Sequence, residues 1–362
     1  MASEPSESSE SPAAPESRPQ SRGDNGGSGG AGGRRVWPWV LAGAILLVFL
    51  VVGVAVLAAV VGVSGGSSGS ASGSESWEES YVTGEGESKI AAIPISGTIT
   101  GGTDDGAFST GGATPDALRS QLQQAEGDPE VEAVILEVDS PGGGVVPSDE
   151  MYRLVRDFKR EAEKPVVADM GSVAASGGYY VSAAADTIVA NPSTLTGSIG
   201  VIFNYTNFGE ALDKVGVDPE PITSGEFKDL ASPANELTEE EREIIESQVQ
   251  DNYDRFVSAI VQGRPLSEER VRELGDGRTY SGEQAASNGL VDELGGIDQA
   301  AAEARELAGI QQAEVVRYEE SPGLLDSLQA RITPEEPEAV KVIEAAGIDP
   351  APEFQYLYRP GW

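Results

Sequence analysis

A run of 28 residues without a charged side chain, residues 36–63, constrains this chain more than any other feature. A helix crosses the hydrocarbon core of a bilayer with about 20 apolar residues, so the run is long enough for one span. A cleaved signal peptide is the alternative interpretation, but its apolar core is only about 7–15 residues long and lies nearer the start of a chain. The run therefore predicts a transmembrane helix.

The side chains around this run predict its orientation. Arg34 and Arg35 come directly before it, and the next basic residue after it is Lys89. Cytoplasmic flanks of membrane helices carry an excess of Lys and Arg, and Trp prefers the membrane interface, as Trp37 and Trp39 would here. We therefore expect a single-pass protein of the cell membrane, with its N-terminus in the cytoplasm and its C-terminal domain outside.

Composition divides the remainder of the chain. Residues 1–35 are rich in Ser, Pro, Glu and Gly with few apolar residues, which predicts a disordered acidic tail. Residues 64–88 form a Gly/Ser-rich acidic linker, and residues 318–362 a Pro/Glu-rich C-terminal tail with one helical patch near 335–345. Only residues 89–317 have the composition of a large folded domain.

The pattern within that domain is α/β. Apolar runs typical of buried strands occur at 89–95, 131–138, 166–170 and 187–190, with a short strand near 220–223. Helical patterns occur at 114–126, 148–163, 207–215 and 238–263, and a small-residue helix begins near Ser176. Thr114 with Pro115, and Thr238 with Glu241, are typical helix starts. Strands that alternate with helices predict layered α/β packing.

The residue types that the chain lacks exclude whole classes of chemistry. It contains no Cys and no His, which excludes disulfides, thiol nucleophiles, His general bases and metal sites built on these ligands. We expect no metal and no cofactor. The 60 acidic residues against 24 basic ones give a net charge of −36, which argues against a nucleic-acid partner because phosphate binding needs a basic surface.

Ser176 is the first candidate for chemistry. It lies where an apolar strand ends and Ser176-Gly177-Gly178 opens a helix, so its hydroxyl would be exposed above the sheet beside free N–H groups. An ordinary N-cap serine is the alternative. A second Gly-rich turn, Gly142-Gly143-Gly144, follows another buried strand and suits an oxyanion hole, a phosphate nest or simply a tight turn.

A serine nucleophile in a chain without His needs another proton acceptor, and lysine is the known substitute. Lys228 lies in a loop beside Phe227 and Leu230, which would withdraw its amine from water. The alternative is a surface lysine paired with Asp229. The other five lysines lie at strand starts, on charged helices or in the tail.

Five segments, in order, resemble the signal peptide peptidase A (SppA) family of Ser–Lys serine peptidases. They are DSPGGG (139–144), ASGGYY (175–180), TGSIG (196–200), SGEFKD (224–229) and RTYSGEQA (278–285), the last leading to GLVD (289–292). Each segment is unspecific alone, but five in order are specific. The resemblance covers about 89–317 and implies an SppA-like peptidase domain with a crotonase-like (ClpP/crotonase) repeated ββα fold.

The resemblance also implies the roles of individual residues. Ser176 would be the nucleophile and Lys228 the general base. The Gly143 N–H would be an oxyanion donor in a substrate-binding loop with Gly142 and Gly144, and Ser198 would orient the lysine amine. Members of the family form ring-like homo-oligomers, so we expect one here.

The family implies a serine endopeptidase that degrades cleaved, hydrophobic signal peptides at the membrane, for which an anchor is well suited. Two alternatives remain open from the sequence. One is a related Ser–Lys membrane protease that trims hydrophobic tails of membrane proteins. The other is a non-catalytic crotonase-fold scaffold or acyl-CoA binder, against which an intact Ser176 and Lys228 both argue.

The charge of −36 predicts a halophilic protein, because repulsion among carboxylates is screened at high salt. We expect folding and activity to require molar salt. Circular dichroism and activity, followed while salt is diluted, test this. Full activity with an unchanged melting temperature at low salt would instead indicate an ordinary acidic surface.

Overall fold

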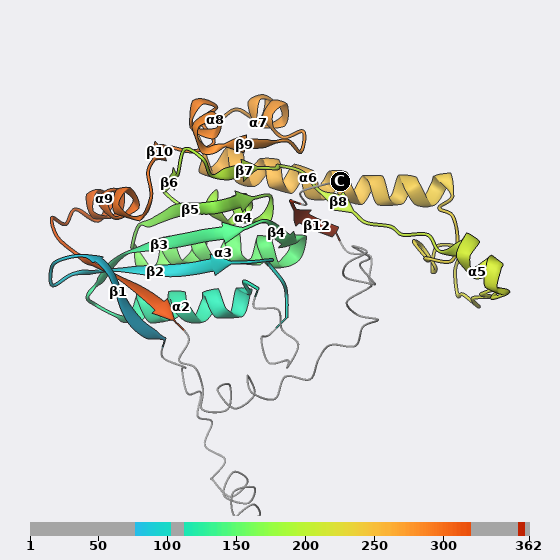
Figure 1. The fold of residues 1–362 in the computed structure, drawn as a ribbon, viewed down its shortest axis with the longest axis horizontal. Helices are drawn as coiled ribbons and strands as arrows, with labels where there is room; N and C mark the ends of the chain where they lie inside the picture. The colour runs from blue at the N-terminus through green and yellow to red at the C-terminus, as the bar shows by residue number, and fades with distance from the viewer. Residues whose placement is uncertain (1–76, 103–111, 320–353, 359–362) are drawn as a thin grey trace, which may run out of the picture. The chain divides into compact units, whose positions relative to one another are not determined.

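The computed structural model describes residues 77–102, 112–319 and 354–358, and a nine-stranded sheet runs through them (Figure 1). Its parallel centre consists of β2 (Lys89–Ser96), β3 (Val131–Ser140), β5 (Val166–Ala175) and β6 (Thr187–Ala190). The sheet continues through β11 (Glu314–Glu319), β1 (Glu78–Gly84), β10 (Glu293–Leu294), β7 (Leu195–Gly197) and β9 (Thr279–Ser281). The expectation of a layered α/β domain with buried strands is confirmed.

Eight described helices accompany the sheet. They are α2 (Pro115–Gly127), α3 (Val145–Ala162), α4 (Gly177–Ser182), α5 (Gly209–Val215), α6 (Glu239–Gly263), α7 (Glu268–Leu274), α8 (Gly282–Ser287) and α9 (Ile297–Ala308). The predicted cap of α2 is confirmed, since the Thr114 side chain accepts from the Ala117 N–H. The capping box of Thr238 and Glu241 at the start of α6 is confirmed as well.

Alternate residues of the central strands bury on opposite faces of the sheet. In β2, Ala91 and Ile93 join the larger core under α2 and α3, whereas Ile90 and Ala92 join a smaller core under α9. This follows from the two-residue period of a strand. Both faces are covered by helices, which explains why the central strands read as continuous apolar runs.

Two strands lie in stretches that composition alone assigned to a linker and a tail. The first is β1, which lies within 64–88 and pairs antiparallel with β11. Just before β1, the Trp77 indole donates to Ser120 Oγ at 3.0 Å. The second of these strands, β12 (Phe354–Leu357), lies in the predicted tail. These strands exist because of distant partners, and their own composition gives little sign of them.

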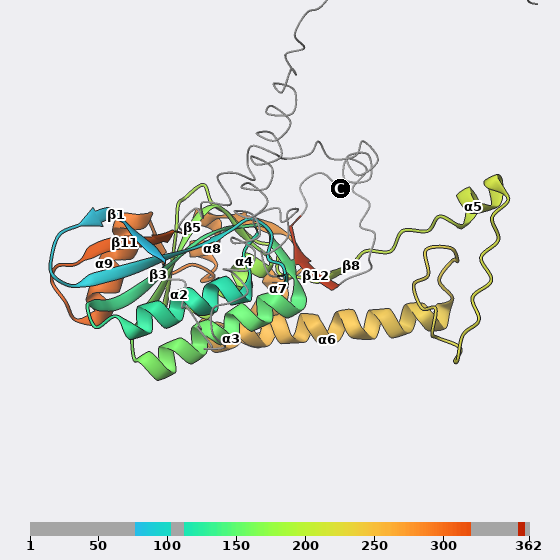
Figure 2. The same ribbon diagram turned by 90° about the horizontal axis from the view of Figure 1, so that it is seen from below.

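Residues 204–244, here called the arm, comprise α5, the loops around it and the first turns of α6. Both views show α5 and these loops extending beyond the edge of the sheet (Figures 1 and 2). No side chain of α5 is buried. The strand predicted near 220–223 is wrong, because this described stretch is exposed and lies beside no strand that could pair with it.

The predicted N-terminal tail, the transmembrane helix at 36–63 and the helical patch near 335–345 lie outside the described residues. Within 77–102, 112–319 and 354–358, no helix has both the length and the apolar character needed to cross a membrane.

Asp169 is a half-buried carboxyl whose protonation affects the stability of the fold. It lies opposite Glu137 in the sheet, and its Oδ1 has no hydrogen-bond partner among the described residues. Burial, and then the charge of Glu137, raises the pKa of Asp169 from 3.8 to about 6. Because the folded pKa exceeds the unfolded one, this carboxyl destabilises the fold increasingly as pH rises from about 4 to about 6.

We expect Asp169→Asn to raise the free energy of unfolding above pH 6 by about 1–3 kcal/mol. The gain should vanish below about pH 4, where both states of the wild type hold the proton. Denaturant unfolding at fixed salt and several pH values measures it. Asp213→Asn, on the exposed α5, is the control, and a gain from Asp169→Asn of the same size at pH 4 would contradict this account.

Candidate functional site

Ser176 occupies a strained turn between β5 and α4. Its backbone adopts φ 54° and ψ −115°, a region that non-glycine residues rarely adopt, and the residue is 1% exposed. The turn is fixed by its main chain: the Ser176 N–H donates to the Gly197 carbonyl, and the Ser176 carbonyl accepts from Tyr180, both at 2.8 Å. Its hydroxyl makes no capping bond, so the ordinary N-cap role is not the one it fills. Strain of this kind clusters at functional sites.

Glycines bring this turn against the Gly-rich strand β4 (Gly142–Gly144). A Cβ at Gly177 would lie 2.5 Å from Ser148 Oγ and 3.1 Å from the Gly143 nitrogen. A Cβ at Gly178 would lie 2.7 Å from the Ser140 carbonyl oxygen. Neither position has room for a side chain, so the main chains meet directly beside Ser176.

The direction of the Gly143 N–H follows from its neighbours. The Ile99 N–H donates to Gly142 at 2.9 Å, and the Gly144 N–H donates to Ile99 at 3.0 Å. Polar groups of successive strand residues point to opposite sides, so the Gly143 N–H faces away from Ile99. On that side β4 pairs with β12, close to the Ser176 turn.

The turn opens into a cavity of about 730 Å³, which is lined by Ser176, Ser198 and side chains of α6 such as Tyr253. Ser198 lies in a second positive-φ turn, at φ 50°, and its N–H donates to the Arg278 carbonyl at 2.9 Å. Together with the Ser176–Gly197 bond, this contact joins three of the five motif segments, and the contact of Gly177 with Gly143 adds DSPGGG as a fourth. The sequence suggested their importance but not their proximity.

Lys228 is not brought to this cavity within the single chain. It lies in the exposed loop between α5 and α6, on the arm, and does not line the cavity. The apolar side chains that were expected to shield its amine from water do not enclose it, since Phe227 is 43% exposed. Nor does an ion pair join Lys228 to Asp229 in this described loop, so neither sequence interpretation describes its surroundings here.

The other described lysines are each held elsewhere. Lys89 is bound by three carboxylates, Lys159 by Asp186 at 2.8 Å and Lys214 by Glu210 at 3.6 Å. Burial lowers the pKa of Lys164, but its ammonium donates to the Ala125 and Asp128 carbonyls near the end of α2. The ten-residue β5, roughly 33 Å long, separates Lys164 from Ser176.

Sequence reasoning missed the aromatic residues behind the turn. Tyr180 and Phe256 lie 4.9 Å apart between ring centroids, and Tyr356 from β12 contacts both. Tyr180 belongs to the ASGGYY segment, but its aromatic partners come from parts of the chain far away. The alternation of large side chains in FQYLY, 354–358, was the available signal for a strand.

The strain at Ser176 predicts an unusual order of stabilities. Glycine adopts φ 54° freely whereas alanine keeps the Cβ that strains the turn, so Ser176→Gly should be more stable than Ser176→Ala by about 1 kcal/mol. Thermal unfolding of both variants measures the difference. At Ser258, on the helix α6, the order should reverse, because glycine weakens a helix. Equal or inverted stabilities of the two variants at position 176 would show that the Ser176 turn is not strained.

Comparison with known proteins supplies the family. The profile of peptidase family S49 matches residues 158–311. A relative from Enterococcus faecium, provisionally named signal peptide peptidase SppA, is 34% identical over 284 residues, which are 76% of this chain and 82% of that protein. Protease 4 of Salmonella typhi is 37% identical over 244 residues, 67% of this chain and 38% of that protein. The chloroplastic serine protease SPPA of Arabidopsis thaliana is 36% identical over 229 residues, 62% of this chain and 33% of that protein.

Residues 158–311, which match the family profile, contain the strained turn and all cavity-lining residues except Gln355, Leu357 and Tyr358. The chain spans only about a third of the two longer relatives but most of the bacterial SppA. The earlier resemblance is thereby confirmed, and the mixed α/β fold with its parallel sheet fits the same assignment. This chain belongs to peptidase family S49, the family of SppA and Protease 4, and is a serine peptidase.

Proposed function

We propose that this protein is a membrane-anchored endopeptidase that uses Ser176 as nucleophile and Lys228 as general base to degrade hydrophobic signal peptides after their release. The observation that carries the proposal is the strained Ser176 turn, which lines the cavity and lies against the strand that bears the Gly143 N–H. A nucleophile and an oxyanion donor close to one another are requirements of acyl transfer.

In the proposed reaction, neutral Lys228 takes the proton of the Ser176 hydroxyl as its Oγ attacks the scissile carbonyl carbon. The carbonyl oxygen becomes an oxyanion, and the Gly143 N–H stabilises it. The C–N bond then breaks, the leaving amine takes the proton from Lys228, and an acyl-enzyme remains. Lys228 next accepts a proton from water, which hydrolyses the ester, and the proton returns to Ser176.

The exposed position of Lys228 determines how the site would be completed. A general base near pH 7 must hold its amine largely neutral, which requires an apolar surrounding for the lysine. We propose that the arm inserts Lys228 into the cavity of a neighbouring copy within a ring-like homo-oligomer. Burial there would lower its pKa, and the Ser198 hydroxyl would orient the amine.

The substrate class rests on the family and on the predicted anchor. Released signal peptides are apolar and stay in the bilayer, so an enzyme held at the membrane meets them in two dimensions. The orientation expected from Arg34, Arg35 and Lys89 would hold the peptidase domain on the extracytoplasmic side.

Lys228→Arg tests the general base. Arginine keeps the positive charge and much of the stem but does not lose its proton in proteins, so peptidase turnover should be abolished. Turnover of a fluorogenic apolar peptide by the full chain measures this, and a fluorophosphonate should label Ser176 in the parent. Lys214→Arg, on the same exposed arm, should keep full activity. Wild-type turnover by Lys228→Arg would remove Lys228 from the mechanism.

The same variant locates the lysine. Mixed with Ser176→Ala and reassembled, Lys228→Arg should regain up to about a quarter of wild-type activity, because some interfaces then pair an intact serine with an intact lysine. If the dyad formed within one chain, the mixture would stay inactive. Size-exclusion chromatography with light scattering establishes that mixed assemblies have formed.

A further inference from the structure

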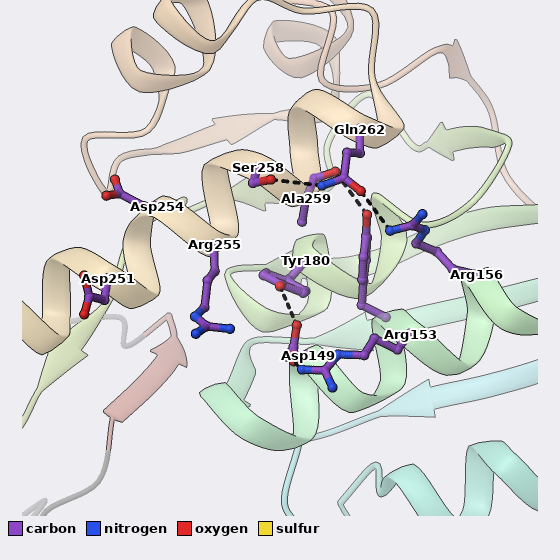
Figure 3. A pocket seen from close by; sticks show the side chains of 11 residues that line it. Asp149, Arg153, Arg156, Tyr180, Asp251, Asp254, Arg255, Ser258, Ala259 and Gln262 are labelled. Carbon is purple, nitrogen blue, oxygen red and sulfur yellow. Dashed lines mark hydrogen bonds and ion pairs between the residues drawn. The ribbon is translucent and has the colours of Figure 1, made fainter.

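A second cavity, here called the α3–α6 cavity, lies between helices α3 and α6 and has a volume of about 680 Å³. Tyr152 of α3 lines it, and Tyr180 of α4 lies between the two helices, as Figure 3 shows. Of the described residues, none lines both this cavity and the one at Ser176. A volume of this size is within the range of small-molecule sites.

Charged side chains without an ionic partner line this cavity. Most arginines of the described domain form an ion pair with Asp or Glu, as expected in a chain with 60 acidic residues. Arg156 of α3 and Arg255 of α6 form none with any described residue, and both line the cavity. Asp251 lines it as well and pairs with no described cation, although it lies one helical turn from Arg255, a spacing at which opposite charges attract.

The neighbours of Arg156 hold its guanidinium at the cavity wall. The guanidinium lies over the Tyr152 ring, 5.6 Å from the centroid, and Nη1 donates to Gln262 Oε1 at 2.8 Å. Gln262 Nε2 in turn donates to Ser258 Oγ at 2.9 Å. A guanidinium has five N–H donors, so most of them remain for a ligand. Figure 3 shows the Arg255 side chain directed from α6 towards α3, so both helices present a guanidinium to the same space.

Opposite charges on the walls of one cavity fit a ligand that carries both. A guanidinium binds a carboxylate through two parallel hydrogen bonds, and a carboxylate binds an ammonium. A short peptide with free ends carries one group of each kind, and a peptidase releases such ends with every cleavage. Tyr152, Tyr180 and Ala259 add aromatic and apolar surface for the side chains between the two ends. A phosphate group would suit the arginines but would be repelled by Asp251.

Tyr180 connects the α3–α6 cavity to the nucleophile turn. Its N–H donates to the Ser176 carbonyl at 2.8 Å, and its hydroxyl donates to Asp149 at 2.9 Å. Asp149 also forms an ion pair with Arg153, a further lining residue. A ligand carboxylate in the cavity competes with Asp149 for Arg153. It therefore acts, through the Asp149–Tyr180 hydrogen bond, on the main chain that holds Ser176.

We propose that the α3–α6 cavity is a second peptide site, in which Arg156 and Arg255 bind the C-terminal carboxylate of a short peptide and Asp251 binds its N-terminal ammonium. A peptide bound there displaces Tyr180 and slows turnover at Ser176, so released fragments restrain the enzyme that produces them. The effect on turnover rests on the proposed function, whereas the binding site does not.

Isothermal titration calorimetry of the full chain with Ser176→Ala, which cannot hydrolyse the probe through Ser176, tests the site at one fixed salt concentration. The tripeptide Ala-Leu-Ala should bind, and amidation of its C-terminus or acetylation of its N-terminus should each weaken binding about tenfold. Arg255→Gln should weaken binding of the free tripeptide about fivefold and leave binding of the amidated one unchanged. Asp251→Asn should behave in the same way towards the free and the acetylated tripeptide.

Arg305→Gln is the matched control for the binding assay. Arg305 of α9 also forms no ion pair with a described residue, but α9 covers the other face of the sheet, so binding should not change. Tripeptide binding that survives both Arg255→Gln and Asp251→Asn unchanged would overturn the proposal. So would Arg255-dependent binding of inorganic phosphate by a chain that does not bind the tripeptide.

Kinetics of the parent chain separate the site from the proposed chemistry. With a fluorogenic apolar substrate, Ala-Leu-Ala should lower kcat severalfold without changing KM, and Arg255→Gln should abolish this inhibition. Inhibition that raises KM alone would place the tripeptide in the Ser176 cavity and refute the regulation. Binding in the expected order by a chain without any peptidase activity would support the site and refute the proposed function.

Discussion

The close contact between two glycine-rich stretches of main chain is the constraint on which the rest of the site depends. At Gly142 and Gly177 there is no room for a Cβ, because β4, the first turn of α4 and β12 lie in direct contact. This contact holds the positive-φ turn of Ser176 against β4, whose Gly143 stands opposite Tyr356 of β12. The central sheet and the covering helices hold these two stretches in register, so the rigid fold supplies the geometry that acyl transfer needs.

A serine peptidase without histidine needs another side chain as general base, and lysine is the candidate here. Four of the five described lysines are engaged by carboxylates or carbonyls away from Ser176, and the fifth, Lys228, lies on an exposed arm. The rigid part of the domain therefore holds the nucleophile, while the candidate base belongs to the part with least burial. Under the proposed function, such a division would make catalysis depend on assembly, because a neighbouring copy would have to enclose the amine.

Local signals in the sequence determined much of this protein. Apolar periodicity located β3 and the core of β5, capping residues located α2 and α6, and the absence of His directed attention to Ser176 with a lysine. These properties depend on neighbours within a few residues. Tertiary structure alone decided that β1 and β12 are strands, that 220–223 is not, and that Lys228 lies apart from Ser176. Each of these depends on partners more than a hundred residues away or on a lack of partners, because a strand forms only where another supplies its hydrogen bonds and an amine is buried only where other elements enclose it.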